Sequence, residues 1–342
     1  MKIAVVASPV TPLRPAQLGG AQALVCDLAA GLARRGHEVR LFCAEGSDVP
    51  GVHVVTVPSP RDAAAALVMP GRGREPAPSP GVAAALASMF EAIRSEPFDA
   101  VSQHAFDAPA FELARDLAVL HTLHLPPIVG AVVAGASSVD GRRLATVSRA
   151  CQDAWRRAGV EVWELLPNGV EDIAVTGEPE PVALIAGRIS PEKGIEHAFA
   201  AARAAGLRVR VAGAHYDPAY AVDLAGAEWE GALTRLDLRA AMARSAVTIC
   251  AVRWDEPFGM VAAEAQMAGC PVAAYRRGAL PEVVEDGVSG FLAEPDDVAA
   301  LTDAVRKCLA LDREAVRASA RRRLGIEAAL DRYEPALARA AR

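Results

Sequence analysis

Residues 256–272 read EPFGMVAAEAQMAGCPV and lie between two apolar runs that have the composition of buried strands. The first run covers residues 246–251, and the second begins at Pro271. The Ala- and Met-rich segment 258–268 has the composition of a helix, and Gly269 stands where a glycine commonly ends one. The pattern therefore predicts a strand, a loop, a helix and a second, parallel strand.

Two carboxylates mark this unit. Glu264 is the only charged residue of the predicted helix, and a buried carboxylate there needs a partner that offsets its desolvation. Glu256 lies on the preceding loop, where the carboxyl ends of parallel strands form ligand crevices. The amides of Gly259, Met260 and Val261 suit an anion. These groups favour a ligand with a sugar, a phosphate and a ribose, whereas a structural loop before a core helix is the alternative interpretation.

Three further glycine-containing motifs occur in order along the chain. They are Gly19-Gly20, GRISPEKG at 187–194 and GALPEVVEDGVSG at 278–290. Together with the E-x7-E spacing they resemble the motifs of the retaining glycosyltransferases of family 4, most strongly over residues 166–310. The resemblance implies the GT-B fold, an α/β architecture of two Rossmann-like, doubly wound domains that face a central cleft, with a C-terminal helix that crosses back to the first domain.

The length agrees with two domains, because 342 residues are many for one and enough for two separate cores. We expect an acceptor-side domain over 1–165, a nucleotide-sugar-binding domain over 166–325 and the returning helix over 326–342. Hydrophobic residues make up 52% but aromatic residues only 5%, so Ala, Val and Leu must fill the cores. The net charge of −6 argues against a nucleic-acid partner held by phosphate contacts.

The chain shows neither a secretory signal nor an apolar run long enough to span a membrane. Its six cysteines are scattered and include no C-x-x-C pair, so we expect reduced core residues: Cys26, Cys43, Cys151, Cys250, Cys270 and Cys308. These features predict a cytoplasmic protein.

Arg188 and Lys193 lie on the loop and helix start that follow the first strand of the second domain. A guanidinium fork and an ammonium group placed there can converge on one diphosphate. Because cations oppose the dipole of a helix N-terminus, a bound anion would resolve the conflict, although two solvated cations remain the alternative. No D-x-D occurs in the chain, so we expect no metal ion and no cofactor beyond the nucleotide sugar.

The resemblance assigns further donor contacts. It implies that the glycines at 19–20 approach the donor diphosphate, that Glu264 binds the ribose and that Glu256 binds the donor sugar. The segment 228–231 matches the strand and loop beside the nucleotide base. The predicted donor-binding residues are Gly19, Gly20, Arg188, Lys193, Glu230, Gly231, Glu256, Phe258, Gly259, Met260, Val261 and Glu264.

Residues 119–127, VLHTLHLPP, predict an apolar strand that runs into a proline turn. The T-x-H motif of the family maps onto Thr122 and His124, which implies that His124 hydrogen-bonds a sugar hydroxyl. His121 lies three residues earlier and therefore on the opposite strand face, so a metal pair is disfavoured and His121 is expected to pack in the core.

Two other segments carry expectations. Residues 58–81 are rich in Pro, Gly and Arg and cannot be regular throughout, which leaves an acceptor loop, a lid or a disordered insertion open. Near the C-terminus, residues 296–311 are typical of an amphipathic helix capped by Asp296, and an arginine-rich segment, 313–323, leads to a last helix over 327–342.

The resemblance implies retaining, metal-independent transfer of a sugar from a nucleotide sugar, usually a UDP-sugar, to a small-molecule acceptor. Arg188, Lys193, Glu256 and His124 are the expected catalytic residues, and the departing phosphate can accept the proton. Overall likeness suggests an enzyme that decorates antibiotics, as in the orthosomycin (avilamycin-type) pathway. The alternatives are a sugar-nucleotide epimerase, a phosphorylase and a non-enzymatic two-domain ligand-binding protein.

Overall fold

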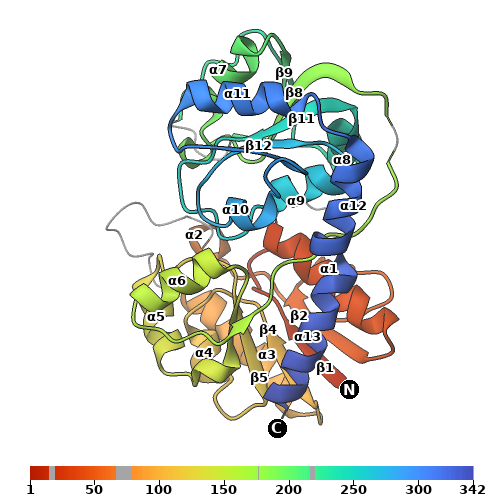
Figure 1. The fold of residues 1–342 in the computed structure, drawn as a ribbon. Coiled ribbons are helices and arrows are strands. Elements are labelled where there is room, and N and C mark those ends of the chain that lie inside the picture. The colour runs from red at the N-terminus through yellow and green to blue at the C-terminus, as the bar shows by residue number, and fades with distance from the viewer. Residues whose placement is uncertain (15–19, 67–78, 176, 216–219, 342) are drawn as a thin grey trace. The chain divides into compact units, whose positions relative to one another are not determined.

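The computed structural model describes residues 1–14, 20–66, 79–175, 177–215 and 220–341. The chain divides into two compact units. Unit 1 consists of Met1–Gly169 together with Ala329–Arg342, and unit 2 is Val170–Ala328. Each unit is built on one sheet of parallel strands with helices packed around it (Figure 1). The predicted α/β class with two doubly wound sheets is thus confirmed.

The sheet of unit 1 has the order β3-β2-β1-β4-β5-β6-β7. Its strands are β1 Lys2–Val6, β2 Glu38–Ala44, β3 His53–Val57, β4 Ala100–Gln103, β5 Val119–Leu123, β6 Leu144–Thr146 and β7 Glu164–Leu165. The chain builds outward from β1 in one direction and then returns to β4 on its other side. This reversal creates the switch point at which doubly wound sheets place ligands, beyond the carboxyl ends of the strands.

The helices of unit 1 are α1 Gly20–Arg34, α2 Ala63–Ala66, α3 Pro80–Arg94, α4 Pro109–Leu113, α5 Gly130–Ser137, η1 Gly141–Arg143 (a 3₁₀ turn) and α6 Arg149–Arg157. The last helix, α13 Ile326–Ala340, contributes its residues from Ala329 onward to the same unit. There it runs beside α1 (Figure 1), and its Glu334 accepts hydrogen bonds from Arg35 at 3.0 Å and His37 at 2.9 Å. The C-terminal residues therefore pack on the first unit, as the sequence predicts.

The sheet of unit 2 has the order β10-β9-β8-β11-β12-β13. Its strands are β8 Glu180–Ala186, β9 Arg208–Ala212, β10 Ala227–Gly231, β11 Ser245–Cys250, β12 Val272–Tyr275 and β13 Gly290–Ala293. Its helices are η2 Pro191–Lys193, α7 Ile195–Ala204, α8 Arg235–Arg244, α9 Met260–Met267, α10 Leu280–Val283, α11 Val298–Cys308 and α12 Arg313–Leu324. The predicted strand–helix–strand unit is confirmed as β11, α9 and β12, and Gly269, at φ 76°, ends the helix.

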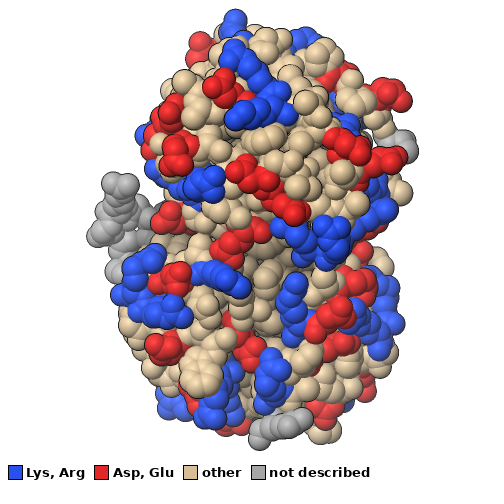
Figure 2. Space-filling view, viewed as in Figure 1, with Lys and Arg blue, Asp and Glu red and all other residues tan. Residues whose placement is uncertain are grey.

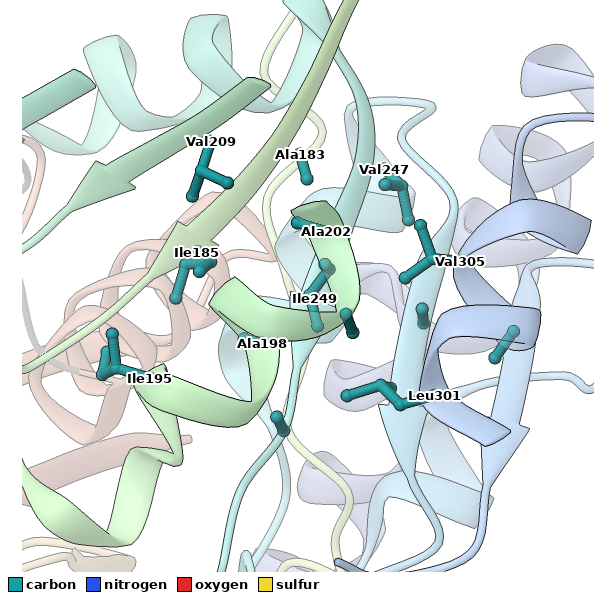
Figure 3. Packing of buried hydrophobic residues seen from close by; sticks show 14 of the residues in the cluster. Ala183, Ile185, Ile195, Ala198, Ala202, Val209, Val247, Ile249, Leu301 and Val305 are labelled. Atoms are coloured by element: carbon teal, nitrogen blue, oxygen red, sulfur yellow. The ribbon is translucent and has the colours of Figure 1, made fainter. Parts of the chain in front are cut away.

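Small and branched side chains fill the core of unit 2. Ala198 and Ala202 on α7, with Leu301 and Val305 on α11, point toward the strands β8, β9 and β11 (Figure 3). Alanines let a helix backbone approach the sheet closely, and each buried apolar square ångström stabilises the fold by about 25 cal/mol. Ala, Val and Leu thus replace aromatic residues as expected, and all six cysteines are buried and form no disulfide among the described residues.

The C-terminal helices differ from the prediction in detail. Asp297, not Asp296, caps α11, because its carboxylate accepts the amide of Ala300 at 2.9 Å. Asp296 adopts φ 63° and instead pairs with Arg277 at 2.7 Å. The arginine-rich segment itself forms a helix, α12, which Asp312 caps. Local composition indicated the helix but could not show which of the two adjacent aspartates caps it.

The Pro-rich segment 58–81 includes one short helix and the start of another. Residues 63–66 form α2, and α3 begins at Pro80, a position that proline tolerates. Residues 67–78, and with them the lid or insertion predicted there, lie outside the described residues.

Acidic and basic side chains are interspersed over the visible face of each unit (Figure 2). No helix within the described ranges is both long and apolar enough to cross a membrane.

Candidate functional site

The loop after β8 presents the two predicted phosphate-binding cations. Lys193 is the last residue of the 3₁₀ turn η2, and α7 begins only after Gly194, so Lys193 precedes the helix rather than starting it. Gly194 has φ 61°, and a Cβ there would lie 2.0 Å from the carbonyl oxygen of Ala251. Only glycine allows this contact with the end of β11, which fixes the loop against the strand that leads to Glu256.

Lys193 and Glu256 meet at this position. Lys193 Nζ lies 2.9 Å from Glu256 Oε2, and both side chains are largely buried, with 19% and 13% exposed. The indole Nε1 of Trp254 donates to the same oxygen at 2.8 Å, and the lysine ammonium lies 5.5 Å from the centre of the Trp254 ring. The structure thus joins two predicted site residues and adds Trp254, which the sequence motifs did not indicate although it lies two residues before Glu256.

Arg188 stands on the same loop and is more exposed than Lys193. Its Nη2 lies 3.5 Å from Glu192 Oε1, and 39% of its side chain is exposed. The Ser190 hydroxyl donates to that carboxylate oxygen at 2.6 Å. The guanidinium therefore lies partly at the surface, beside the Glu192 carboxylate.

A second glycine holds the Glu256 loop from the other side. Gly278 has φ 55°, and a Cβ there would lie 2.3 Å from the amide nitrogen of Glu256. The next amide, of Ala279, donates to the Glu256 carbonyl at 2.8 Å. Within the motif at 278–290, Gly278 and Ala279 therefore act structurally, by placing the Glu256 backbone.

Helix α9 begins directly after this loop. Its N-cap is Gly259 in the left-handed conformation, φ 101°, which has no side chain to accept the first-turn amides. Met260 and Val261 form the first turn, and Phe258 is buried just before it. The N-terminus of α9 therefore has no side-chain cap from Gly259, and its helix dipole favours negative charge there.

The buried carboxylate of α9 has the partners that its burial requires. Glu264 Oε1 lies 3.3 Å from Arg239 Nη2 and 3.7 Å from Arg235 Nε. Both arginines are buried on α8. Two arginines at i and i+4 on a helix repel each other unless an anion lies between them. Their spacing is therefore the sequence signal that could have identified them as the partners of Glu264.

The residues predicted to lie beside the nucleotide base are at the end of β10. Glu230 Oε1 is 3.2 Å from the buried Arg210 Nε, so Glu230 is part of an ion pair within the sheet. Gly231 turns the chain at φ 66°, and its carbonyl accepts the amide of Gly213 at 2.7 Å. The exposed Trp229 indole donates to the Gly213 carbonyl at 2.9 Å. These contacts tie Gly213, directly after β9, to the end of β10.

In unit 1, His124 follows β5 and is buried. Its Nε2 lies 2.9 Å from Nδ1 of His104, and the two rings stack at 5.2 Å. The Ser102 hydroxyl lies 2.8 Å from the other nitrogen of His104. Burial lowers the pKa of His124 to about 4, so the ring is neutral at pH 7. His104 was not foreseen, because it lies on the neighbouring chain segment after β4.

His121 packs separately from His124. It stacks on Phe111 at 4.8 Å, and its Nδ1 lies 3.2 Å from Gln103 Oε1, which agrees with a packed residue. Across the described ranges, no cluster of three or more His, Cys, Asp or Glu side chains could hold a metal ion. Gly20 begins α1, whereas Gly19 lies outside the described residues.

Two family models together match almost the whole chain. Residues 18–172 match the model of Glycosyltransferase Family 4, and residues 171–327 match the model described as Glycosyl transferases group 1. The two matches are contiguous and leave out only the ends of the chain. The chain belongs to these glycosyltransferases.

Relatives of the glycosyltransferase match over short segments. A D-inositol 3-phosphate glycosyltransferase of Geodermatophilus obscurus is 49% identical over 71 residues, which are 21% of this chain and 16% of that protein. A glycogen synthase of Mycobacterium tuberculosis is 33% identical over 138 residues, 37% of this chain and 33% of that protein. The chain thus matches a third or less of the length of these relatives.

Solved structures resemble the glycosyltransferase over its whole length. AviGT4, described as a glycosyltransferase involved in avilamycin A biosynthesis, gives a TM-score of 0.75 at 23% identity and covers 99% of this chain and 98% of its own. Anabaena HepE in complex with UDP-glucose gives a TM-score of 0.73 at 19% identity and covers 99% and 100%. These likenesses show the GT-B fold that the motifs predict.

Proposed function

We propose that this glycosyltransferase transfers a sugar from a UDP-sugar to a small-molecule acceptor, with retention of anomeric configuration and without a metal ion. Unit 2 binds the donor and unit 1 the acceptor. One observation carries the proposal: each of the two glutamates is held by nitrogen donors through one oxygen. Lys193 and Trp254 hold Oε2 of Glu256, and the two arginines of α8 face Oε1 of Glu264.

The remaining oxygens are the ones offered to the donor. Glu256 Oε1 accepts hydroxyls of the donor sugar, and Glu264 Oε2 accepts the ribose hydroxyls. A carboxylate whose other oxygen is fixed by charged donors cannot rotate freely, so its acceptor oxygen is held in place before the ligand arrives. Such preorganisation lowers the entropic cost of binding.

Cations and helix amides stabilise the leaving diphosphate. Lys193 has three N–H donors, of which one serves Glu256 and two remain for phosphate oxygens. Arg188 adds a guanidinium fork from the same loop, and the first amides of α9 add the positive end of a helix dipole. Preorganised charges of this kind contribute most to catalysis when negative charge builds up on a leaving group.

His124 is the proposed sugar contact of unit 1. Because its ring is neutral at pH 7, it exchanges a hydrogen bond with a sugar hydroxyl rather than pairing with a phosphate. No protein base is needed: the acceptor hydroxyl attacks the anomeric carbon on the face that the diphosphate leaves, and the departing phosphate oxygen takes the proton.

The donor and acceptor classes are inferred from relatives. HepE was solved with UDP-glucose, which supports UDP as the nucleotide of the donor. AviGT4 is described as acting in avilamycin A biosynthesis, which supports an antibiotic precursor as the acceptor. A role in the cytoplasm follows from the need for a nucleotide sugar.

Calorimetric titration with UDP, GDP, ADP and NAD in excess EDTA tests the proposal. We expect UDP to bind, and Lys193→Ala or Arg188→Ala to weaken binding and lower turnover at least tenfold, which corresponds to about 1.4 kcal/mol. Lys307→Ala, which removes a lysine on α11, is the matched control and should change neither quantity.

Three outcomes contradict the proposal. Binding of NAD alone, or of no nucleotide, would favour a ligand-binding protein of another kind. Conversion of the nucleotide sugar without any acceptor would indicate an epimerase. Full turnover in both the Lys193 and Arg188 variants would remove the assigned phosphate site.

A further inference from the structure

A cavity of about 790 Å³ lies within unit 1, away from the residues assigned to the proposed transfer site. Its wall includes Val119, the first residue of β5, Arg143, directly before β6, and Trp163, directly before β7. These residues mark the amino ends of three neighbouring strands. His124 follows the carboxyl end of β5, so the cavity and the proposed transfer site lie at opposite edges of the sheet. The volume is that of a small-molecule site.

The cavity has an excess of positive charge. Four arginines and two carboxylates line it. Arg142 forms a fork with Asp140, at 2.5 Å for the closest pair, and Arg339 forms a second fork with Glu164 at 2.8 Å. Within each pair the carboxylate balances the charge of the arginine, and hydrogen bonding to Arg142 lowers the pKa of Asp140 to about 2. The remaining arginines, Arg115 and Arg143, supply the excess.

Arg143 is the better placed of the two. Arg115, in the turn after α4, is highly exposed and stands 3.7 Å from Glu112. The partly buried Arg143 donates through Nη1 to the backbone carbonyl of Leu117 at 3.2 Å. Over the part of the chain that the structure describes, Arg143 forms no ion pair with a carboxylate. Asp140 lies close enough for Arg143 to lower its pKa, but its carboxylate is engaged by Arg142, so a partly buried guanidinium without a directly paired carboxylate favours an anionic ligand.

His121 adds an acceptor to the wall. Gln103 donates through Nε2 to the carbonyl of Ala105 at 2.7 Å, which fixes its amide so that Oε1 faces His121. His121 Nδ1 must therefore carry the hydrogen, and burial, reinforced by Arg143, lowers its pKa to about 3, so the ring is neutral. Nε2 is then a bare lone pair, buried and without a partner among the described residues. It requires a hydroxyl or N–H donor.

Trp163 supplies an aromatic face. Its side chain is 64% exposed, which is unusual for so large an apolar group. Its amide donates to the carbonyl of Gly141 at 3.1 Å, so the ring is tied to the 3₁₀ turn that carries Arg142 and Arg143. A flat ring beside a cation and a hydrogen-bond acceptor suits the apolar face of a sugar ring.

We propose that this cavity binds a phosphorylated sugar. The phosphate pairs with Arg143, the sugar ring lies on Trp163, and one hydroxyl donates to His121 Nε2. The ligand is held and not transferred, so the cavity is an accessory or effector site. The proposal does not depend on the donor site of unit 2.

Calorimetric titration of the full chain with glucose 6-phosphate tests it, with saturating UDP present to occupy the donor site. We expect binding that weakens at least tenfold in Arg143→Gln and at least threefold in Trp163→Ala. Arg306→Gln, which removes an exposed arginine of α11, should bind as the wild type does. Glucose and inorganic phosphate should each bind at least tenfold more weakly than glucose 6-phosphate.

The opposite results overturn the proposal. No binding of glucose 6-phosphate, or equal affinity in wild type, Arg143→Gln and Trp163→Ala, would show that the cavity is not the site. Inorganic phosphate binding as tightly as glucose 6-phosphate would exclude sugar recognition. An unchanged urea unfolding midpoint in Arg143→Gln and Trp163→Ala reports that unit 1 stays folded, and this control does not depend on UDP binding. If UDP does not bind the wild-type protein, that result contradicts only the proposed transferase function and not the proposed sugar-phosphate site.

Discussion

Two buried polar clusters, one in each unit, respond to desolvation in opposite ways: one stays charged and the other is neutral. The ionic cluster, Arg235, Arg239 and Glu264, keeps its charges because opposite charges face each other at 3.3 and 3.7 Å. The imidazole cluster, Ser102, His104 and His124, contains no carboxylate of its own, and burial lowers the pKa of both histidines. Where the fold supplies an opposite charge, charge is retained; where it does not, the group becomes neutral.

This difference matches the parts of a nucleotide sugar. A charged cluster that leaves one carboxylate oxygen available suits the vicinal hydroxyls of a ribose, beside the cations that suit a diphosphate. A neutral imidazole pair suits an uncharged sugar hydroxyl. Substitutions in each cluster test whether the two differ in this way.

The largest effect should come from breaking the ionic cluster. Glu264→Gln removes the anion but leaves two buried guanidinium groups, and breaking a buried pair in this way costs about 3 to 5 kcal/mol of unfolding free energy. Urea unfolding followed by tryptophan fluorescence measures the loss. Glu228→Gln is the control. The Glu228 side chain pairs with Arg210 but is 42% exposed, so its loss should cost less than about 1 kcal/mol.

A further variant sharpens this test. Replacing all three members with apolar residues of similar size, Arg235→Met, Arg239→Met and Glu264→Leu, removes the unpaired charges and should restore much of the lost stability. It should not restore UDP binding, because Glu264 Oε2 is gone. If Glu264→Gln unfolds at the same urea concentration as wild type, the cluster is not held by charge.

The ionic cluster also shows how far the sequence predicts the site. The helix with Glu264, the loop with Glu256 and the cations Arg188 and Lys193 are readable because composition, spacing and glycine positions are local signals. The close approaches at Gly194 and Gly278 are not, because each is made with a residue of another strand or loop.

His104 shows more clearly what the sequence does not predict. It meets His124 only because β4 and β5 are neighbours in the sheet, and strand order is a tertiary property that the sequence does not show directly. The same applies to the first aspartate of the 296–297 pair, whose left-handed backbone is set by contacts with Arg253 and Arg277. Elements and motifs were predictable, whereas the partners of buried groups were largely not.

The imidazole cluster should make stability depend on pH. The folded pKa of His124, about 4, lies below the ordinary value of 6.5, so the unfolded chain binds a proton more readily. The stabilisation is therefore complete above pH 6.5 and is lost as pH falls toward 4. Between pH 7 and pH 5 each such histidine should cost roughly 2 kcal/mol of unfolding free energy, measured by urea titration at each pH.

Two variants separate the cluster from other titrating groups. His124→Gln should reduce the fall between pH 7 and pH 5 by about the contribution of one histidine. His53→Gln, at an exposed position on β3, should leave the fall unchanged. A fall of the same size in wild type and His124→Gln would mean that His124 is not kept neutral by burial.

The smallest effect should come from Trp254, which acts on the ligand only through Glu256. Trp254→Phe removes the N–H that fixes Glu256 Oε2 at 2.8 Å but keeps an aromatic ring beside Lys193. One hydrogen bond to a charged group is worth about 1.5 kcal/mol, of which Lys193 retains a share by holding the same oxygen, so we expect a threefold to tenfold loss in kcat/KM for the UDP-sugar. UDP affinity should be unchanged if Glu256 contacts the sugar and not the nucleotide, as proposed. A loss of UDP affinity equal to the loss in kcat/KM would instead place Trp254 at the diphosphate, and the separation of sugar-binding and phosphate-binding groups within unit 2 would be wrong.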